Sequence, residues 1–292
     1  MSTPQFRIID GVLYRRLCTP YSYDLRIHDL GHGHVEALAQ PRYGWSEVGV
    51  CSPAALADAD MAKDHIWSDG DWLPKKESEQ ELLDKAARNR ERSARRARTQ
   101  VRRLVKAKNL DTMLTLTYQE NMTERARMAR DFDVFMKRVR RLLPEFEYVC
   151  VFEPQKRGAW HAHIAVQRIC SHYLYKGTLV KSYDLLRSIW RAVVGSGNVD
   201  VSRALRKRQR NIGKLAGYLS KYIAKGFDAG QEGDSYRASG RALPKPVVIR
   251  SLATDVAGAA SDLASAIRAF WPNGEFYSAL LDGGGYFVSI TP

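Results

Sequence analysis

The apolar side chains between residues 112 and 201 switch repeatedly between two spacings, and this alternation restricts the possible folds more than any other feature of the chain. A two-residue period is typical of a strand with one buried face, and spacings of three and four residues are typical of a helix. The predicted segments are a strand over 112–118, a helix of about 20 residues ending at Pro144, strands over 148–153 and 160–166, a helix over 183–194 and a strand around 199–201.

The order of these segments is β-α-β-β-α-β. This is the split βαβ, or ferredoxin-like, order, in which two helices lie on one face of an antiparallel sheet. We therefore expect an α+β fold. A further helix is expected over residues 211–225, with Gly226 as its C-terminal cap. Outside this block, we expect an irregular or β-rich module over the first 75 residues, a helix over 254–270 and a hairpin around 282–285.

His161 and His163 lie two residues apart inside the strand predicted over 160–166. The period of a strand places both rings on one face, about 7 Å apart along the backbone, so both can reach one divalent cation. If the preceding turn is centred near Arg157, Glu153 lies opposite His161 and on the same face. Two imidazoles and a carboxylate suit Mg²⁺ or Mn²⁺ acting as a Lewis acid. Two packed or surface histidines are the alternative interpretation.

Tyr218 and Tyr222 lie at positions i and i+4 of the helix predicted over 211–225, at the margin of its apolar stripe. Lys221 and Lys225 lie just beyond them. One edge of this helix therefore carries two phenols and two ammonium groups. Tyrosines packed against the core, beside lysines that extend into the solvent, are the alternative interpretation.

The remaining histidines and the cysteines carry weaker signals. His32 and His34 also form a His-x-His pair, but the adjacent glycines disfavour a stiff strand, so we expect a flexible hairpin with solvated histidines rather than a second metal site. Four widely spaced cysteines without a Cys-x-x-Cys pair favour reduced thiols in the core over disulfides or a zinc ribbon. They are Cys18, Cys51, Cys150 and Cys170.

The formal net charge of +14 is unevenly distributed along the chain. Residues 1–84 hold 8 Lys and Arg against 14 Asp and Glu, residues 85–108 hold 11 against 1, and residues 109–292 hold 27 against 17. A polyanion suits the positive remainder, because each neutralised phosphate releases counterions. The absence of Pro and Gly predicts one long helix over 77–108, facing either nucleic acid or solvent. The arginines expected to contact DNA are Arg95, Arg96, Arg102 and Arg103.

These patterns divide the chain into an acidic module (1–84), a basic helix (85–108), a domain carrying the histidine and tyrosine motifs (109–247) and a C-terminal extension (248–292). No apolar run approaches the roughly 18 residues of a membrane span, and the first residues do not resemble a signal peptide. We expect an intracellular protein with no membrane partner.

Three motifs occur in the order found in HUH endonucleases. They are the Leu-Thr-Leu-Thr-Tyr strand at 114–118, the His161-Ala-His163 strand and the Tyr218-x-x-Lys221-Tyr222 helix. Together they resemble the two-tyrosine rolling-circle replication initiators of single-stranded DNA phages and related plasmids. The resemblance covers roughly residues 109–247, and the segment 237–244 is similar to the short tail that follows the tyrosine helix in that family.

The resemblance implies metal-dependent, site-specific nicking and joining of single-stranded DNA at a replication origin through a 5′-phosphotyrosine link. The histidine pair and Glu153 would hold Mg²⁺ or Mn²⁺. The order in which the two tyrosines attack stays open, although Lys221 lies beside Tyr222 and favours it. Residues expected to lie near the cut DNA are Thr115, Thr117, Tyr118 and Lys225.

The chain lacks a Gly-x4-Gly-Lys-Ser/Thr loop, so no ATP-driven unwinding is expected from it. A helicase and a polymerase would then come from a bacterial host, in whose cytoplasm the protein would act. The alternatives are a two-tyrosine transposase or relaxase with the same chemistry, and a non-enzymatic regulator that binds the origin.

Overall fold

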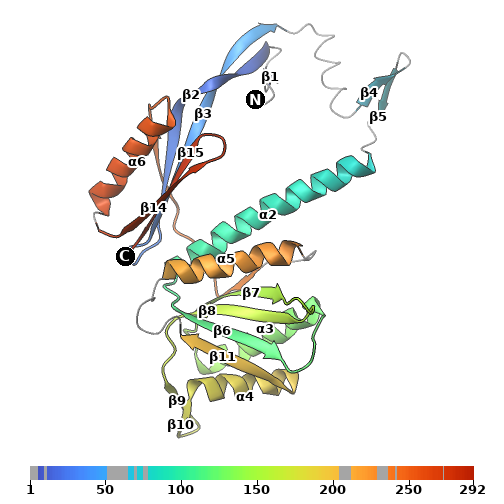
Figure 1. The fold of residues 1–292 in the computed structure, drawn as a ribbon, viewed down its shortest axis with the longest axis vertical. Helices are drawn as coiled ribbons and strands as arrows, with labels where there is room; N and C mark the ends of the chain where they lie inside the picture. The colour runs from blue at the N-terminus through green and yellow to red at the C-terminus, as the bar shows by residue number, and fades with distance from the viewer. Residues whose placement is uncertain are drawn as a thin grey trace.

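The computed structural model describes residues 6–9, 12–50, 65–68, 71–74, 78–203, 212–228, 236–240, 242–271 and 273–292. Over these residues the chain is a mixed structure of antiparallel sheets and five helices (Figure 1). The coarse α+β class predicted from the sequence is therefore confirmed. Within the described ranges, no helix is long and apolar enough to cross a membrane.

A five-stranded antiparallel sheet forms the part of the molecule that carries the histidines (Figure 1). Its order is β11 (Gly197–Arg203), β6 (Thr112–Tyr118), β8 (Trp160–Val166), β7 (Tyr148–Pro154) and β12 (Tyr236–Ala238). The first four strands lie where the alternating pattern predicted them. In β6 every second residue is buried, because Leu114 and Leu116 enter the core while the threonines between them face the other side of the sheet.

Two helices, α3 (Arg125–Leu142) and α4 (Ser182–Val194), pack on the first face of this sheet. Their apolar stripes bury Phe132, Phe135 and Trp190 completely, and the Trp190 indole N–H donates to the carbonyl of Thr117 at 3.0 Å. A small hairpin precedes α4 and consists of β9 (His172–Tyr175) and β10 (Thr178–Lys181).

The second face of the sheet is partly covered by α5 (Ile212–Asp228), which packs against the C-terminal half of α2 (Glu79–Ala107). The helix α2 begins with a capping box, in which Ser78 and Glu81 satisfy each other's backbone N–H groups. The prediction that Gly226 ends α5 is wrong, since the helix continues to Asp228. A helical glycine costs only about 1 kcal/mol relative to alanine, so it does not force a cap.

A second antiparallel sheet joins the two ends of the chain (Figure 1). Its members are β1 (Phe6–Ile9), β2 (Val12–Asp29), β3 (Val35–Val50), β13 (Val247–Ser251), β14 (Glu275–Leu281) and β15 (Gly285–Thr291). The helix α6 (Val256–Phe270) covers one face of it. The β-rich start, the helix over 254–270 and the hairpin near 282–285 are thus confirmed. A separate hairpin contains β4 (His65–Ser68) and β5 (Asp71–Pro74).

A buried ion cluster connects this second sheet to α2. Glu36 on β3 is fully buried and accepts hydrogen bonds from Arg102, Arg103 and Lys106 at 2.7 to 3.1 Å. Lys106 also donates to the Ser289 hydroxyl at 2.9 Å. Burial alone would raise the pKa of Glu36, but the hydrogen bonds and charges of the basic residues outweigh it and lower the pKa to about 2.

Two expectations for the N-terminal module need correction. His34 is not solvated but buried, and neither of its ring nitrogens has a hydrogen-bond partner among the described residues. Burial and then the charge of Lys106 lower the pKa of His34 to about 4. Of the cysteines, Cys150 is a core thiol as expected, whereas Cys18 and Cys170 are exposed. Cys51 lies outside the described residues.

Candidate active site

The two histidines of β8 lie on the sheet face that α5 partly covers. Backbone pairing places Glu153 on β7 directly opposite His161, as the hairpin geometry predicted. The carboxylate of Glu153 accepts a hydrogen bond from His163 Nε2 at 2.7 Å. Since Nε2 then carries the proton, Nδ1 accepts from the Thr115 hydroxyl at 3.3 Å. Strands β6, β7 and β8 therefore each contribute one partner to this cluster.

The tyrosines of α5 meet the same histidine. The ring of Tyr222 stacks on His163 with a centroid separation of 4.3 Å, and the ring of Tyr218 lies 6.4 Å from it. The Tyr222 hydroxyl donates a hydrogen bond to the Tyr218 hydroxyl. Tyr222 is only 8% exposed, whereas Tyr218 is 41% exposed. Burial, the hydrogen bond to Tyr218 and the charge of Glu153 all raise the pKa of the Tyr222 phenol.

His161 has a partner that sequence reasoning missed. The amide nitrogen of Gln155 lies 3.2 Å from His161 Nδ1. Its position two residues after Glu153, on the same hairpin, was the available signal. Burial, followed by the nearby charge of His163, lowers the pKa of His161. A neutral imidazole is the form that coordinates metals.

The three predicted metal ligands are neighbours, but they do not converge on one point. The rings of His161 and His163 are 6.4 Å apart, and Glu153 bonds directly to His163. Among the described residues, no three His, Cys, Asp or Glu side chains are placed to hold a metal ion. The donor types, two imidazole nitrogens and a carboxylate, nevertheless fit a divalent cation, and insertion of a cation would replace the bond between His163 and Glu153.

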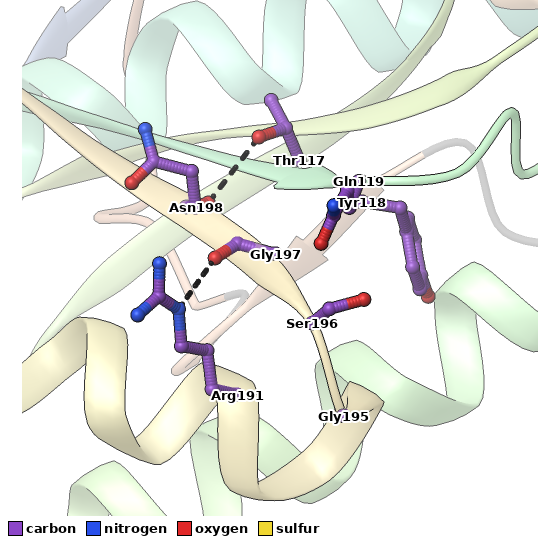
Figure 2. A pocket seen from close by; sticks show the side chains of 8 residues that line it. All are labelled: Thr117, Tyr118, Gln119, Arg191, Gly195, Ser196, Gly197 and Asn198. Carbon is purple, nitrogen blue, oxygen red and sulfur yellow. Dashed lines mark hydrogen bonds between the residues drawn. The ribbon is translucent and has the colours of Figure 1, made fainter.

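A polar pocket of about 580 Å³ lies beyond the ends of β6 and α4 (Figure 2). Thr117 and Asn198 face each other across its wall, and the Thr117 hydroxyl donates to the Asn198 carbonyl at 3.4 Å. On the far side, Arg191 donates to the Gly197 carbonyl at 3.0 Å. Of the residues expected near DNA, Thr117 therefore borders an open polar surface.

The other residues expected near DNA occupy different environments. Tyr118 is buried, and its hydroxyl donates to Asp131 at 2.7 Å, so burial and this bond raise the pKa of its phenol. Arg102 and Arg103 bond to the buried Glu36. Exposed positions are those of Arg95, Arg96 and Lys221, while Lys225 lies in α5 with its side chain outside the described part of the structure.

Comparisons with known proteins bear on the domain that contains this cluster. No curated protein and no solved structure matches the chain significantly. Residues 111–227, which run from β6 to the end of α5 and include both histidines and both tyrosines, match the model of a family of replication-associated proteins, that of ORF2 and the gene 2 protein, as expected for a rolling-circle replication initiator.

Proposed function

We propose that this protein nicks and rejoins single-stranded DNA to start and finish rolling-circle replication. The single observation that carries the proposal is the stacking of Tyr222 on His163, which brings two phenols to the edge of the histidine and carboxylate cluster. The strand order β11-β6-β8-β7, with α3 and α4 on one face, supports a split βαβ scaffold for the site. The family match supports a role in replication.

His161, His163 and Glu153 would hold the Mg²⁺ or Mn²⁺. When bound there, the ion would supply Lewis acidity that withdraws charge from the scissile phosphate. Gln155 would orient His161, because its amide oxygen can accept a proton from Nδ1 after a half turn and leave Nε2 for the ion. Thr115 would orient His163 in the same way through its hydroxyl.

The nucleophile is a tyrosine oxygen. Its attack forms a bond between tyrosine and phosphorus, and the bond from phosphorus to the 3′ oxygen breaks. The products are a 5′-phosphotyrosine and a 3′-hydroxyl, which takes up a proton. The new phosphodiester keeps the energy of the old one, so the strand can be rejoined without ATP.

Tyr218 is the better candidate for the first attack, although the sequence favoured Tyr222. The Tyr218 oxygen accepts a hydrogen bond from Tyr222, which stabilises a Tyr218 phenolate. Tyr218 is also the more exposed ring. Tyr222, whose pKa is raised, would act second on the regenerated origin while Tyr218 holds the first 5′ end, and a closed circle would be released. Lys221 would attract the DNA backbone beside them, and host enzymes in the bacterial cytoplasm would unwind and copy the strand.

The test is to incubate the full chain with Mn²⁺ and a set of labelled single strands that cover a candidate origin. We expect a covalent complex on a denaturing gel, and none from the double variant Tyr218→Phe/Tyr222→Phe. An adduct in the double variant would place the nucleophile elsewhere. Release of single-stranded circles from an origin plasmid separates an initiator from a transposase or relaxase. Salt-dependent binding without any cleavage would instead identify a regulator.

A further inference from the structure

The long strands β2 and β3 continue well beyond the sheet to which they belong (Figure 1). Flanking strands pair only with residues 23–27 of β2 and 35–39 of β3. Beyond them, β1, residues 12–20 of β2 and residues 43–50 of β3 form what we call the distal ribbon. Eight residues of extended chain give it a length of about 25 Å. The Tyr43 hydroxyl, 3.4 Å from the Gly283 carbonyl, links its base to the turn between β14 and β15.

One face of the distal ribbon carries arginines stacked on aromatic rings. Arg7 pairs with Tyr14 across the strands, and Arg16 pairs with Trp45, so the pleat places all four on the same side. The guanidinium of Arg7 lies 4.1 Å from the Trp45 ring centre, and that of Arg16 lies 3.8 Å from the Tyr43 ring centre. Such stacking holds a guanidinium in place and leaves the N–H groups at its rim directed outward.

The charge of the distal ribbon is opposite to that of the N-terminal segment as a whole. Residues 1–84 carry a net charge of −6, from 8 basic and 14 acidic residues. The described residues of the distal ribbon hold three arginines, Arg7, Arg15 and Arg16, and one carboxylate, Glu47. Planar guanidinium groups match phosphate oxygens and the acceptor edge of guanine. A positively charged, aromatic-backed ribbon is therefore suited to nucleic acid.

We propose that the distal ribbon binds duplex DNA next to the site of nicking. The ring faces of Trp45 and Tyr43 are already occupied by guanidinium groups, so they are poor platforms for unstacked bases. A narrow antiparallel ribbon, in contrast, fits the major groove of B-DNA. The proposal rests on the proposed function only for the identity of the DNA, which would be the duplex that flanks the origin.

The experiment compares two neighbouring arginines of the full-length protein. Arg16 lies on the aromatic face, and Arg15 is exposed on the opposite face of the same strand. Affinity is measured by fluorescence anisotropy for a labelled duplex and for a single strand of the same sequence. We expect Arg16→Ala and Arg7→Ala each to weaken duplex binding about five- to tenfold and to lower the salt slope by about one, with little change for Arg15→Ala.

Further readouts keep the outcomes distinct. Arg16→Lys keeps the charge and loses the planar stack, so we expect most of the loss to remain. Equal losses for Arg15→Ala and Arg16→Ala, or losses confined to the single strand, would overturn the proposal. Cleavage of single-stranded oligonucleotides should be unchanged in all variants. If the wild type cleaves no oligonucleotide while Arg16→Ala still loses duplex binding, nicking is refuted and the ribbon proposal stands.

Discussion

The phenol ring of Tyr222 lies nearly parallel to the imidazole of His163, with an angle of 13° between their planes. The ring and the hydroxyl of Tyr222 therefore have separable tasks. We expect Tyr222→Phe to keep the stack and still form the first covalent adduct through Tyr218, but to release no circles. Tyr222→Ala should lose the stack and reduce the first adduct as well. Adduct yield and circle release, measured together, check this, and abundant circles from Tyr222→Phe would contradict it.

His161→Ala should reduce Mn²⁺-dependent nicking by a factor of at least about 100, because one of two imidazole donors is removed. The matched control is His172→Ala, which removes an exposed imidazole from the small hairpin before α4. Both variants are compared for cleavage rate over a Mn²⁺ titration. Equal rates in His161→Ala and the wild type would remove the metal role that we assign to this residue.

Deletion of residues 85–108 would not test DNA binding by α2, because Val101 and Leu104 of this helix are fully buried in the core. Arg95 and Arg96 lie in its exposed half and can be changed without disturbing that core. We expect Arg95→Gln/Arg96→Gln to lower the slope of log Kd against log salt by about one to two. Oligonucleotide cleavage at low salt should persist, and an unchanged slope would exclude these residues from phosphate contact.

Local patterns predicted much of the central domain. The opposition of Glu153 and His161 could be derived because a short hairpin loop fixes the register of its strands. The burial of Tyr118 followed from the same reasoning, since it shares its face of β6 with Leu116. Its expected position beside DNA overlooked that alternation.

Contacts between distant segments could not be derived in this way. The pairing of β3 with β15 joins strands more than 200 residues apart, and strand patterns do not specify partners at that distance. For the same reason, Glu36 could not be matched with Arg102 and Arg103, whose spacing on α2 gave only a basic helix face. The hydrogen bond from Gln155 to His161 depends on side-chain rotamers rather than on register.

Gly197 tests how β11 is fitted against α4. A Cβ atom at this position would lie 2.6 Å from the Thr117 carbonyl oxygen and 2.7 Å from Trp190 Nε1. Gly197→Ala should therefore destabilise the protein by about 1–3 kcal/mol. Gly217→Ala on α5 is the matched control, since its Cβ would meet no atom within 4 Å and alanine favours a helix. Urea unfolding should show a lower midpoint for the first variant and an equal or higher midpoint for the second.

The cluster around Glu36 should make the protein sensitive to acid. The pKa of Glu36 is about 2 in the folded protein, below its ordinary value of 4.5, so its ion pairs contribute full stability above pH 4.5 and lose it as the pH falls toward 2. The pKa of His34 is about 4 instead of 6.5. The unfolded chain therefore takes up a proton at His34 before the folded protein does, and stability also decreases as the pH falls from 6.5 to 4.

Unfolding free energies measured between pH 7 and pH 3 separate these two contributions. Glu36→Gln leaves three cations without their carboxylate and should cost about 3–5 kcal/mol at pH 7. Glu91→Gln, which breaks the exposed pair with Arg95, is the control and should cost less than about 0.5 kcal/mol. His34→Leu should flatten the curve between pH 6.5 and 4 but leave the loss below pH 4.5. If His34→Leu keeps the wild-type slope in the upper window, His34 is not the group that titrates there.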